Sequence, residues 1–229
     1  MKLEPLGDSA VVATLGPGID AATLASVLSL SRAILASGHR AITDVVPAYG
    51  SVTAFYNPEG FGPAEGDPYD QVCRLIEACG RHPTASASPF KSRQVEIPVC
   101  YGREFGPDLA LVAEHCRLGA AEVIAAHAGA DYLVHAIGFT PGFPYLGGLP
   151  EALQSPRRGT PRAHVAAGSV GIGGYQTGVY PVDSPGGWQI IGRTPVALFR
   201  PDREPAALLR PGDRVRFRAI TAAEFESWT

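Results

Sequence analysis

The first 40 residues change from strand-like alternation to a helical repeat. Apolar and polar side chains alternate from Ser9 to Thr14, a pattern typical of a half-buried strand. Apolar side chains then recur at helical spacing from Leu24 to Leu35. Asp20 is a suitable N-cap for this helix, and Gly38 supplies its stop. The segment therefore predicts a strand followed by a helix.

Two more strands and a second helix complete the first pattern. Runs typical of strands occupy 42–47 and 51–56, and a helical repeat covers about 68–78, with Gly80 predicted to end it. The order strand, helix, strand, strand, helix favours an antiparallel sheet with helices on one face. We therefore expect an α+β N-terminal domain, similar to a ferredoxin-like unit, over residues 1–81.

The periodicity stops between the two halves of the chain. Residues 82–92 are rich in Ser, Ala and Pro and cannot bury an apolar face, so they predict a linker. Regular patterns resume near Arg93, where a second domain covering 93–229 is expected to begin. The elements predicted early in this domain are a strand at 95–99, helices at 108–117 and 120–128, and a strand at 132–139.

Glycine and proline dominate the next part of the chain. The sequence has 27 glycines and 21 prolines, and 21 of these residues fall between Gly138 and Pro195. Both residue types punctuate regular structure, so we expect short strands joined by turns, with later strands at 196–199 and 214–220. This turn density favours a closed or nearly closed barrel, and hence a mainly β second domain.

Composition and charge narrow the classes of partner. The formal net charge is −3 and the pI is about 6.1, so no general attraction to nucleic acid or to an anionic membrane surface is expected. Glu4, Pro5 and Asp8 interrupt the start where a signal peptide needs an apolar core, and we expect a cytoplasmic protein. The four cysteines form no C-x-x-C pair and are expected to be reduced thiols.

Common catalytic and cofactor motifs do not match this chain. Its two lysines, Lys2 and Lys91, lie outside any Walker-type phosphate loop. In the glycine cluster from Gly168 to Gly174, Gln176 takes the place of the last glycine of a dinucleotide-binding loop. The six histidines show no metal-binding spacing, so no metal site is predicted and the catalytic residues stay unknown.

An arginine cluster is the strongest candidate for ligand binding. Arg157, Arg158 and Arg162 lie within six positions, and Pro156 and Pro161 restrain the backbone beside them. Three guanidinium groups on a restrained loop could bind a carboxylate, carbamoyl or phosphate group. The contrary interpretation is a solvated charged face.

Polar residues among the later glycines are further candidates. Gln176, Thr177, Tyr180 and Arg193 are predicted at strand ends and loops, where they could line a pocket. Alternatively, Thr and Tyr are ordinary strand residues that fill the barrel. His127 precedes the strand that leads into the glycine-rich region, and a structural role is favoured over a catalytic one.

A series of motifs in the second half identifies a resemblance. Together with the opening Leu6-Gly-Asp-Ser-Ala10, these motifs resemble the allophanate hydrolase subunit 1 family, also called the family of 5-oxoprolinase B subunits or of sporulation kinase inhibitors. The matching segments are Gly138 to Gly148 (GFTPGFPYLGG), Pro156 to Arg158 (PRR), Pro161-Arg162, Ala167 to Ile172 (AGSVGI), Gln176 to Pro181 (QTGVYP), Ser184 to Pro195 (SPGGWQIIGRTP) and Pro211 to Asp213 (PGD).

The resemblance implies a fold and three candidate activities. The second domain should be a cyclophilin-like barrel. The first candidate is the B subunit of an ATP-dependent 5-oxoprolinase, which converts 5-oxoproline to glutamate with partners related to the A and C subunits and is inactive alone. ATP, with Mg²⁺ bound to it, would be shared with those partners. The second candidate is a non-catalytic inhibitor of a sensor histidine kinase, and the third is a carboxyltransferase-type subunit of an allophanate or urea-using enzyme.

Overall fold

Two compact units make up the chain. The computed structural model describes residues 1–62, 66–81 and 92–228. The contacts within it separate Met1–Lys91 from Ser92–Thr229, and each unit is described by itself. The linker predicted at 82–92 lies outside the described residues except for Ser92, so it stays a prediction.

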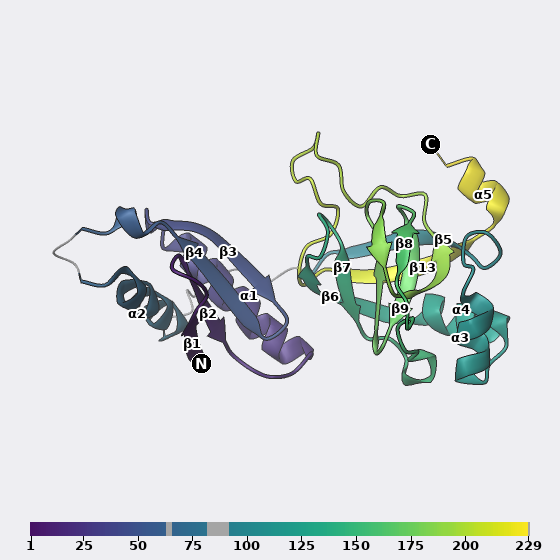
Figure 1. Cartoon of the computed structure of the whole chain (residues 1–229), viewed down its shortest axis with the longest axis horizontal. Helices are drawn as coiled ribbons and strands as arrows, with labels where there is room; N and C mark the ends of the chain where they lie inside the picture. The colour runs from purple at the N-terminus through teal and green to yellow at the C-terminus, as the bar shows by residue number, and fades with distance from the viewer. Residues whose placement is uncertain (63–65, 82–91, 229) are drawn as a thin grey trace. The chain divides into compact units, whose positions relative to one another are not determined.

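The first unit is a four-stranded antiparallel sheet with two helices packed on it (Figure 1). Side chains from three of its strands and both helices form one apolar core, so the helices cover a single face. In sheet order the strands are β1 (Lys2–Pro5), β2 (Ala10–Thr14), β4 (Ser51–Tyr56) and β3 (Ile42–Ala48); the helices are α1 (Ala21–Ala36) and α2 (Pro68–Arg81), and a short 3₁₀ turn, η1, covers Pro58–Gly60.

Local sequence explains most of this unit. The Asp20 carboxylate accepts the Thr23 backbone N–H at 2.8 Å and so caps α1 as predicted. Gly38 takes a left-handed backbone (φ +61°) just beyond the helix end, as a stop glycine does. Residues of β4 alternate between half-buried and fully buried, which matches the period of a strand with one face on the core.

Two features of the first unit differ from expectation. The edge strand β1 has no signal in the sequence, because its residues are mostly exposed and carry no alternating pattern. Helix α2 continues through Gly80 to Arg81; buried Val72 and Ile76 anchor it, and a glycine costs a helix only about 1 kcal/mol. The prediction of mixed α and β content is confirmed. The similarity to a ferredoxin-like unit stays a prediction, because the sheet has an extra N-terminal edge strand, β1, that the predicted order of elements does not contain.

The second unit is built on a closed seven-stranded barrel, as predicted (Figure 1). Strands β5 and β13 run parallel, and the other neighbouring strands of the barrel are antiparallel. The strands, in barrel order, are β10 (Gln176–Val179), β7 (Pro144–Gly147), β6 (Asp131–Ile137), β13 (Arg214–Ile220), β5 (Gln94–Tyr101), β12 (Gln189–Arg193) and β9 (Ser169–Gly173).

Shorter elements surround the barrel. A separate two-stranded ribbon pairs β8 (Arg162–Val165) with β11 (Ser184–Gly186). The predicted strand at 196–199 is wrong: the Val196 N–H bonds the Thr194 hydroxyl at 3.2 Å in a local turn, and only Phe199 makes an isolated bridge. The helical elements are α3 (Leu109–Cys116), α4 (Ala120–Gly129), the 3₁₀ turn η3 (Glu151–Leu153) and α5 (Ala222–Glu226).

The second unit has two apolar clusters. The larger one fills the barrel and packs α3 and α4 against it. The smaller one consists of Phe143, Val165, Tyr180, Trp188 and Ile190. Its members come from β8, from β12 and from the residues next to β7, β10 and β12. They form a cluster separate from the one that fills the barrel. Within the described residues, no helix is long and apolar enough to cross a bilayer.

Candidate functional site

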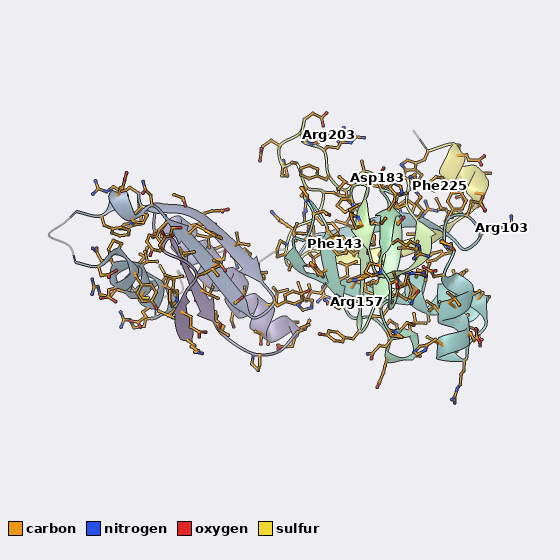
Figure 2. The ribbon with its side chains drawn as sticks, viewed as in Figure 1. Arg103, Phe143, Arg157, Asp183, Arg203 and Phe225 are labelled. Atoms are coloured by element: carbon orange, nitrogen blue, oxygen red, sulfur yellow. The ribbon has the colours of Figure 1, made fainter. Side chains whose placement is uncertain are left out.

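A cavity of about 430 Å³ opens beside the smaller apolar cluster. Its wall is aromatic, and we call it the aromatic cavity; Phe143 and Arg157 from its lining are labelled in Figure 2. The rings are those of Phe139, Phe143, Tyr145, Tyr180 and Trp188. The polar side chains on the same lining are Thr140, Arg157, Arg158 and Ser184.

Glycines make room for these rings. A Cβ on Gly173 would lie 2.6 Å from the Trp188 indole, and one on Gly186 would overlap the Tyr180 hydroxyl. The Phe143 ring then packs edge-on against Tyr180 and Trp188, with centroids 5.2 and 5.4 Å away. The glycines that the sequence shows between strands thus shape the wall of the cavity.

Phe139 stands at the cavity as an exposed aromatic ring. Its side chain is 63% exposed, and its backbone is left-handed (φ +69°), a conformation that is unusual for a bulky residue. The surrounding turn holds it, because Gly138 N–H bonds the Phe143 carbonyl at 3.1 Å and Phe143 N–H bonds the Thr140 carbonyl at 3.0 Å. Such strain is more common at functional sites than elsewhere.

The arginine cluster is organised by a buried acid that no sequence motif marks. Asp108 is 2% exposed, and its Oδ1 accepts from Arg162 Nη2 at 2.7 Å and from Arg158 Nη1 at 3.3 Å. Its Oδ2 accepts the Ile190 backbone N–H at 2.7 Å. A buried carboxylate needs such partners, and here they come from 50 to 82 positions away. In the sequence, Asp108 only stands at the start of a predicted helix, so no local signal reveals this role.

Arg157 differs from the other two arginines. Its guanidinium lies over the Trp188 ring, 5.7 Å from the centroid, and its side chain is exposed. Among the residues that the structure describes, no carboxylate pairs with it. The three arginines therefore do not converge as three free cations, nor do they form a simple solvated face: two share Asp108, and one remains available beside the cavity.

His127 and Thr177 lie in the barrel core, away from the aromatic cavity lining. Thr177 donates to the Gly171 carbonyl at 2.9 Å, so its oxygen accepts from His127 Nε2 at 2.9 Å. His127 Nδ1 in turn accepts from the Tyr101 hydroxyl at 2.8 Å. Burial lowers the pKa of His127 to about 3, so the ring is neutral. This geometry supports the structural role for His127.

The remaining predicted residues are dispersed. Tyr180 is in the cavity wall, where burial raises the pKa of its phenol. Gln176 is buried at the start of β10 and does not line the cavity. Arg193 donates to the Ala167 carbonyl at 2.8 Å and lines a hollow of about 160 Å³ that also contains Arg162 and His164.

The aromatic cavity is a better candidate for a ligand site than the other features of the described chain. A larger hollow of about 670 Å³ lies in the first unit; most of its described lining residues are apolar or small, and the charged side chains among them are those of Glu77 and Arg81. The aromatic cavity combines apolar walls with several polar groups, which is the usual composition of a ligand site. In the described part of the chain, no three His, Cys, Asp or Glu side chains are grouped to hold a metal ion.

Comparison with known proteins identifies the family. The family model for the carboxyltransferase domain, subdomain C and D, matches residues 1–209. This chain belongs to that family. Within the family, it is 41% identical over 235 residues to the 5-oxoprolinase B subunit of Bacillus subtilis, covering 99% of this chain and 96% of that protein. It is 44% identical over 213 residues to the 5-oxoprolinase B subunit of Escherichia coli O157:H7, covering 93% of each.

The fold is also similar to that of a protein of known crystal structure. The protein TTHA0988 superposes with a TM-score of 0.78 and is 37% identical over 93% of this chain. The matched part is 40% of TTHA0988, so this chain spans less than half of that protein. The resemblance inferred from the motifs between Gly138 and Asp213 is therefore confirmed.

Proposed function

We propose that this chain is the B subunit of an ATP-dependent 5-oxoprolinase, acting in the cytoplasm with partner subunits. The observation that carries this proposal is the match, over nearly the full length, to proteins named as B subunits of 5-oxoprolinase. Such a name implies a complex of several chains. We propose that the partners are homologues of the A and C subunits of such a complex.

The proposed reaction explains why ATP is needed. A lactam carbonyl is a weak electrophile at neutral pH. Transfer of the γ-phosphoryl group from ATP to the lactam oxygen releases ADP and makes the ring carbon electrophilic. Water then adds to that carbon, the ring C–N bond breaks and phosphate leaves, which gives glutamate, ADP and phosphate. The protein's contribution is to position the reactants and to stabilise the developing negative charge.

The described residues of this chain suit only part of that task. Arg157 and Arg158 offer guanidinium groups to an anion, and Tyr180 and Trp188 offer apolar walls to a small ring. A phosphate loop is absent from the sequence. Nucleophile activation and the ATP site with its Mg²⁺ are therefore assigned to the assembled complex rather than to this chain alone.

The test is release of glutamate from 5-oxoproline. The purified chain, the partner subunits and the reconstituted mixture are each assayed with and without MgATP. We expect glutamate and ADP in equal amounts only from the mixture with ATP. Release by this chain alone, or no release by any complete mixture that assembles, would contradict the proposal.

The match to the carboxyltransferase domain family favours a second candidate, a carboxyltransferase-type subunit of an allophanate or urea-using enzyme. The same reconstituted mixture, supplied with urea and a carboxylated biotin carrier in place of 5-oxoproline, would then form a carboxylated urea.

Inhibition of a sensor histidine kinase is a third outcome, measured as loss of kinase autophosphorylation when this chain is added. Glutamate release separates the first proposal from both.

A further inference from the structure

We infer that the aromatic cavity is the binding site for a small cyclic amide that carries a carboxylate. The ring would lie between the aromatic side chains, the carboxylate would bind the arginines, and the amide would bond buried hydroxyl groups. The inference rests on the proposed function in taking 5-oxoproline as the ligand of this chemical class. It adds the place where this chain would hold that ligand.

The walls of the cavity suit a small flat ring. Phe143 and Trp188 are 2% and 5% exposed, and Tyr180 is 1% exposed, so the wall is preformed. The volume of about 430 Å³ lies in the lower part of the range typical of small-molecule sites. Because glycines at 173, 178 and 186 let the rings pack closely, the wall is rigid and little ordering is needed on binding.

The charge around the cavity selects an anion. Arg157 and Arg158 line the cavity, and Arg158 shares the buried carboxylate of Asp108 with Arg162. These three guanidinium groups and one carboxylate together carry an excess of two positive charges. Arg157 has no acidic partner among the described residues, and Arg158 uses Nη1 for Asp108 while its buried Nε has no hydrogen-bond partner there. Both therefore keep donors that a carboxylate can accept from.

Two buried hydroxyl groups are the candidates for bonding the amide of the ligand. The side-chain oxygens of Thr140 and Ser184 are buried, belong to residues lining the cavity, and have no hydrogen-bond partner in the described part of the chain. Ser184 is itself only 9% exposed. Buried hydroxyls are normally bonded, and a rotation about χ1 would turn either oxygen towards a ligand in the cavity that supplies the missing partner. A lactam offers one acceptor oxygen and one N–H donor, and a hydroxyl can bond either.

A nucleotide is the principal rival for this cavity, because an adenine ring also stacks on aromatic side chains. Its triphosphate carries more negative charge than the excess of two provided here, and no lysine of the described residues lines the cavity. We therefore assign the lactam to the aromatic cavity and treat nucleotide binding there as an outcome that would overturn the inference.

Direct binding can be followed with one tryptophan. The chain has two, Trp188 in the cavity wall and Trp228 beyond α5, so Trp228→Phe leaves Trp188 as the sole reporter. We expect 5-oxoproline to change its emission saturably. Removing the carboxylate, as in 2-pyrrolidinone, should weaken binding on the order of 10-fold or more. Equal affinity for both compounds, or displacement of 5-oxoproline by ATP, would overturn the inference.

Variants in the reconstituted complex separate this inference from the proposed function. Arg157→Ala should raise KM for 5-oxoproline on the order of 10-fold, with Arg157→Lys recovering part of the loss. Ser184→Ala should raise KM less. The matched control is Arg203→Ala, an exposed arginine of the 200–207 segment whose side chain does not line the cavity (Figure 2); its KM should not change.

The outcomes are distinguishable. Glutamate release with an unchanged KM in Arg157→Ala and Ser184→Ala overturns the cavity assignment and leaves the proposed function in place. Saturable, carboxylate-dependent binding to a complex that releases no glutamate contradicts the proposed function and supports the cavity assignment. Melting curves confirm that each variant is folded, and the exposed position of Arg157 makes its loss tolerable for the fold.

Discussion

Arg162 and Asp108 form a short ion pair, 2.7 Å between Nη2 and Oδ1, across 54 positions of the chain. Arg162 begins β8, and the same carboxylate accepts the backbone N–H of Ile190 in β12. The pair therefore connects the β8–β11 ribbon to the barrel. Because Arg158 is the second partner of Asp108, this connection also sets the position of a cavity arginine.

Replacing Asp108 with Ala should lower the free energy of unfolding of the second unit by about 3–5 kcal/mol. The change leaves two partly buried arginines and the Ile190 N–H without their acceptor. Urea unfolding followed by tryptophan fluorescence measures this, since both tryptophans lie in this unit. In Asp131→Ala, which removes an exposed pair with Arg216, the loss should stay below about 1 kcal/mol. Equal losses would contradict the organising role of Asp108.

Replacing Arg158 with Ala should affect activity more than stability. Asp108 keeps Arg162 as a closer partner, so we expect a loss of about 1 kcal/mol in the free energy of unfolding. Loss of a charge-assisted contact to the carboxylate of the ligand costs about 1.5–3 kcal/mol, or about 10-fold to 150-fold in kcat/KM of the reconstituted complex. Arg158→Lys should restore part of this, because lysine keeps the charge without the planar fork. An unchanged kcat/KM in Arg158→Ala would remove the residue from the site.

The stability of the second unit should fall as pH is lowered from about 6.5 towards 3, with His127 as one cause. Its pKa is about 3 in the folded chain and near 6.5 when unfolded, so the unfolded state binds the extra proton in this window. The slope from one such group is at most about 1.4 kcal/mol per pH unit.

His127→Gln tests this origin. Carboxylates whose pKa is lowered in the folded state, such as Asp183 and Glu224, also reduce stability in acid, so the useful quantity is the difference between the two proteins. At pH 7 the native protein should be more stable, because the variant disturbs the bonds to Tyr101 and Thr177. That difference should shrink as pH falls from 7 to 5. Parallel pH profiles would show that His127 does not titrate in this way.

Replacing Gly173 with Ala should disturb the aromatic cavity through Trp188. The new Cβ would lie 2.6 Å from the indole, which packs between neighbouring rings and cannot move freely. Overpacking of this kind costs about 1–3 kcal/mol and should shift the Trp188 emission. Gly159→Ala is the matched control, since nothing lies within 4 Å of its added Cβ. If both variants had native stability and emission, the packing account would be wrong.

Local sequence by itself determined the elements whose signals lie within a few residues. Asp20 and the apolar repeat of Leu24 to Leu35 specify α1, and the alternation from Ser9 to Thr14 specifies β2. The concentration of glycine and proline after Gly138 indicated short strands in a closed barrel, and the motifs of that region identified the family. These features follow from backbone preferences and side-chain periodicity, which act over short stretches of chain.

Tertiary structure alone decided which polar residues share a site. The proximity of Arg157, Arg158 and Arg162 in the sequence did not reveal that two of them pair with Asp108, 50 and 54 positions earlier. Nor did the glycine-rich surroundings of Thr177 reveal that it bonds His127 inside the barrel, while Tyr180, three residues later, lines the aromatic cavity. Barrel closure brings distant segments together, so it decides which groups pair with a buried charge and towards which side the residues at strand ends face. It has no local signature in the sequence.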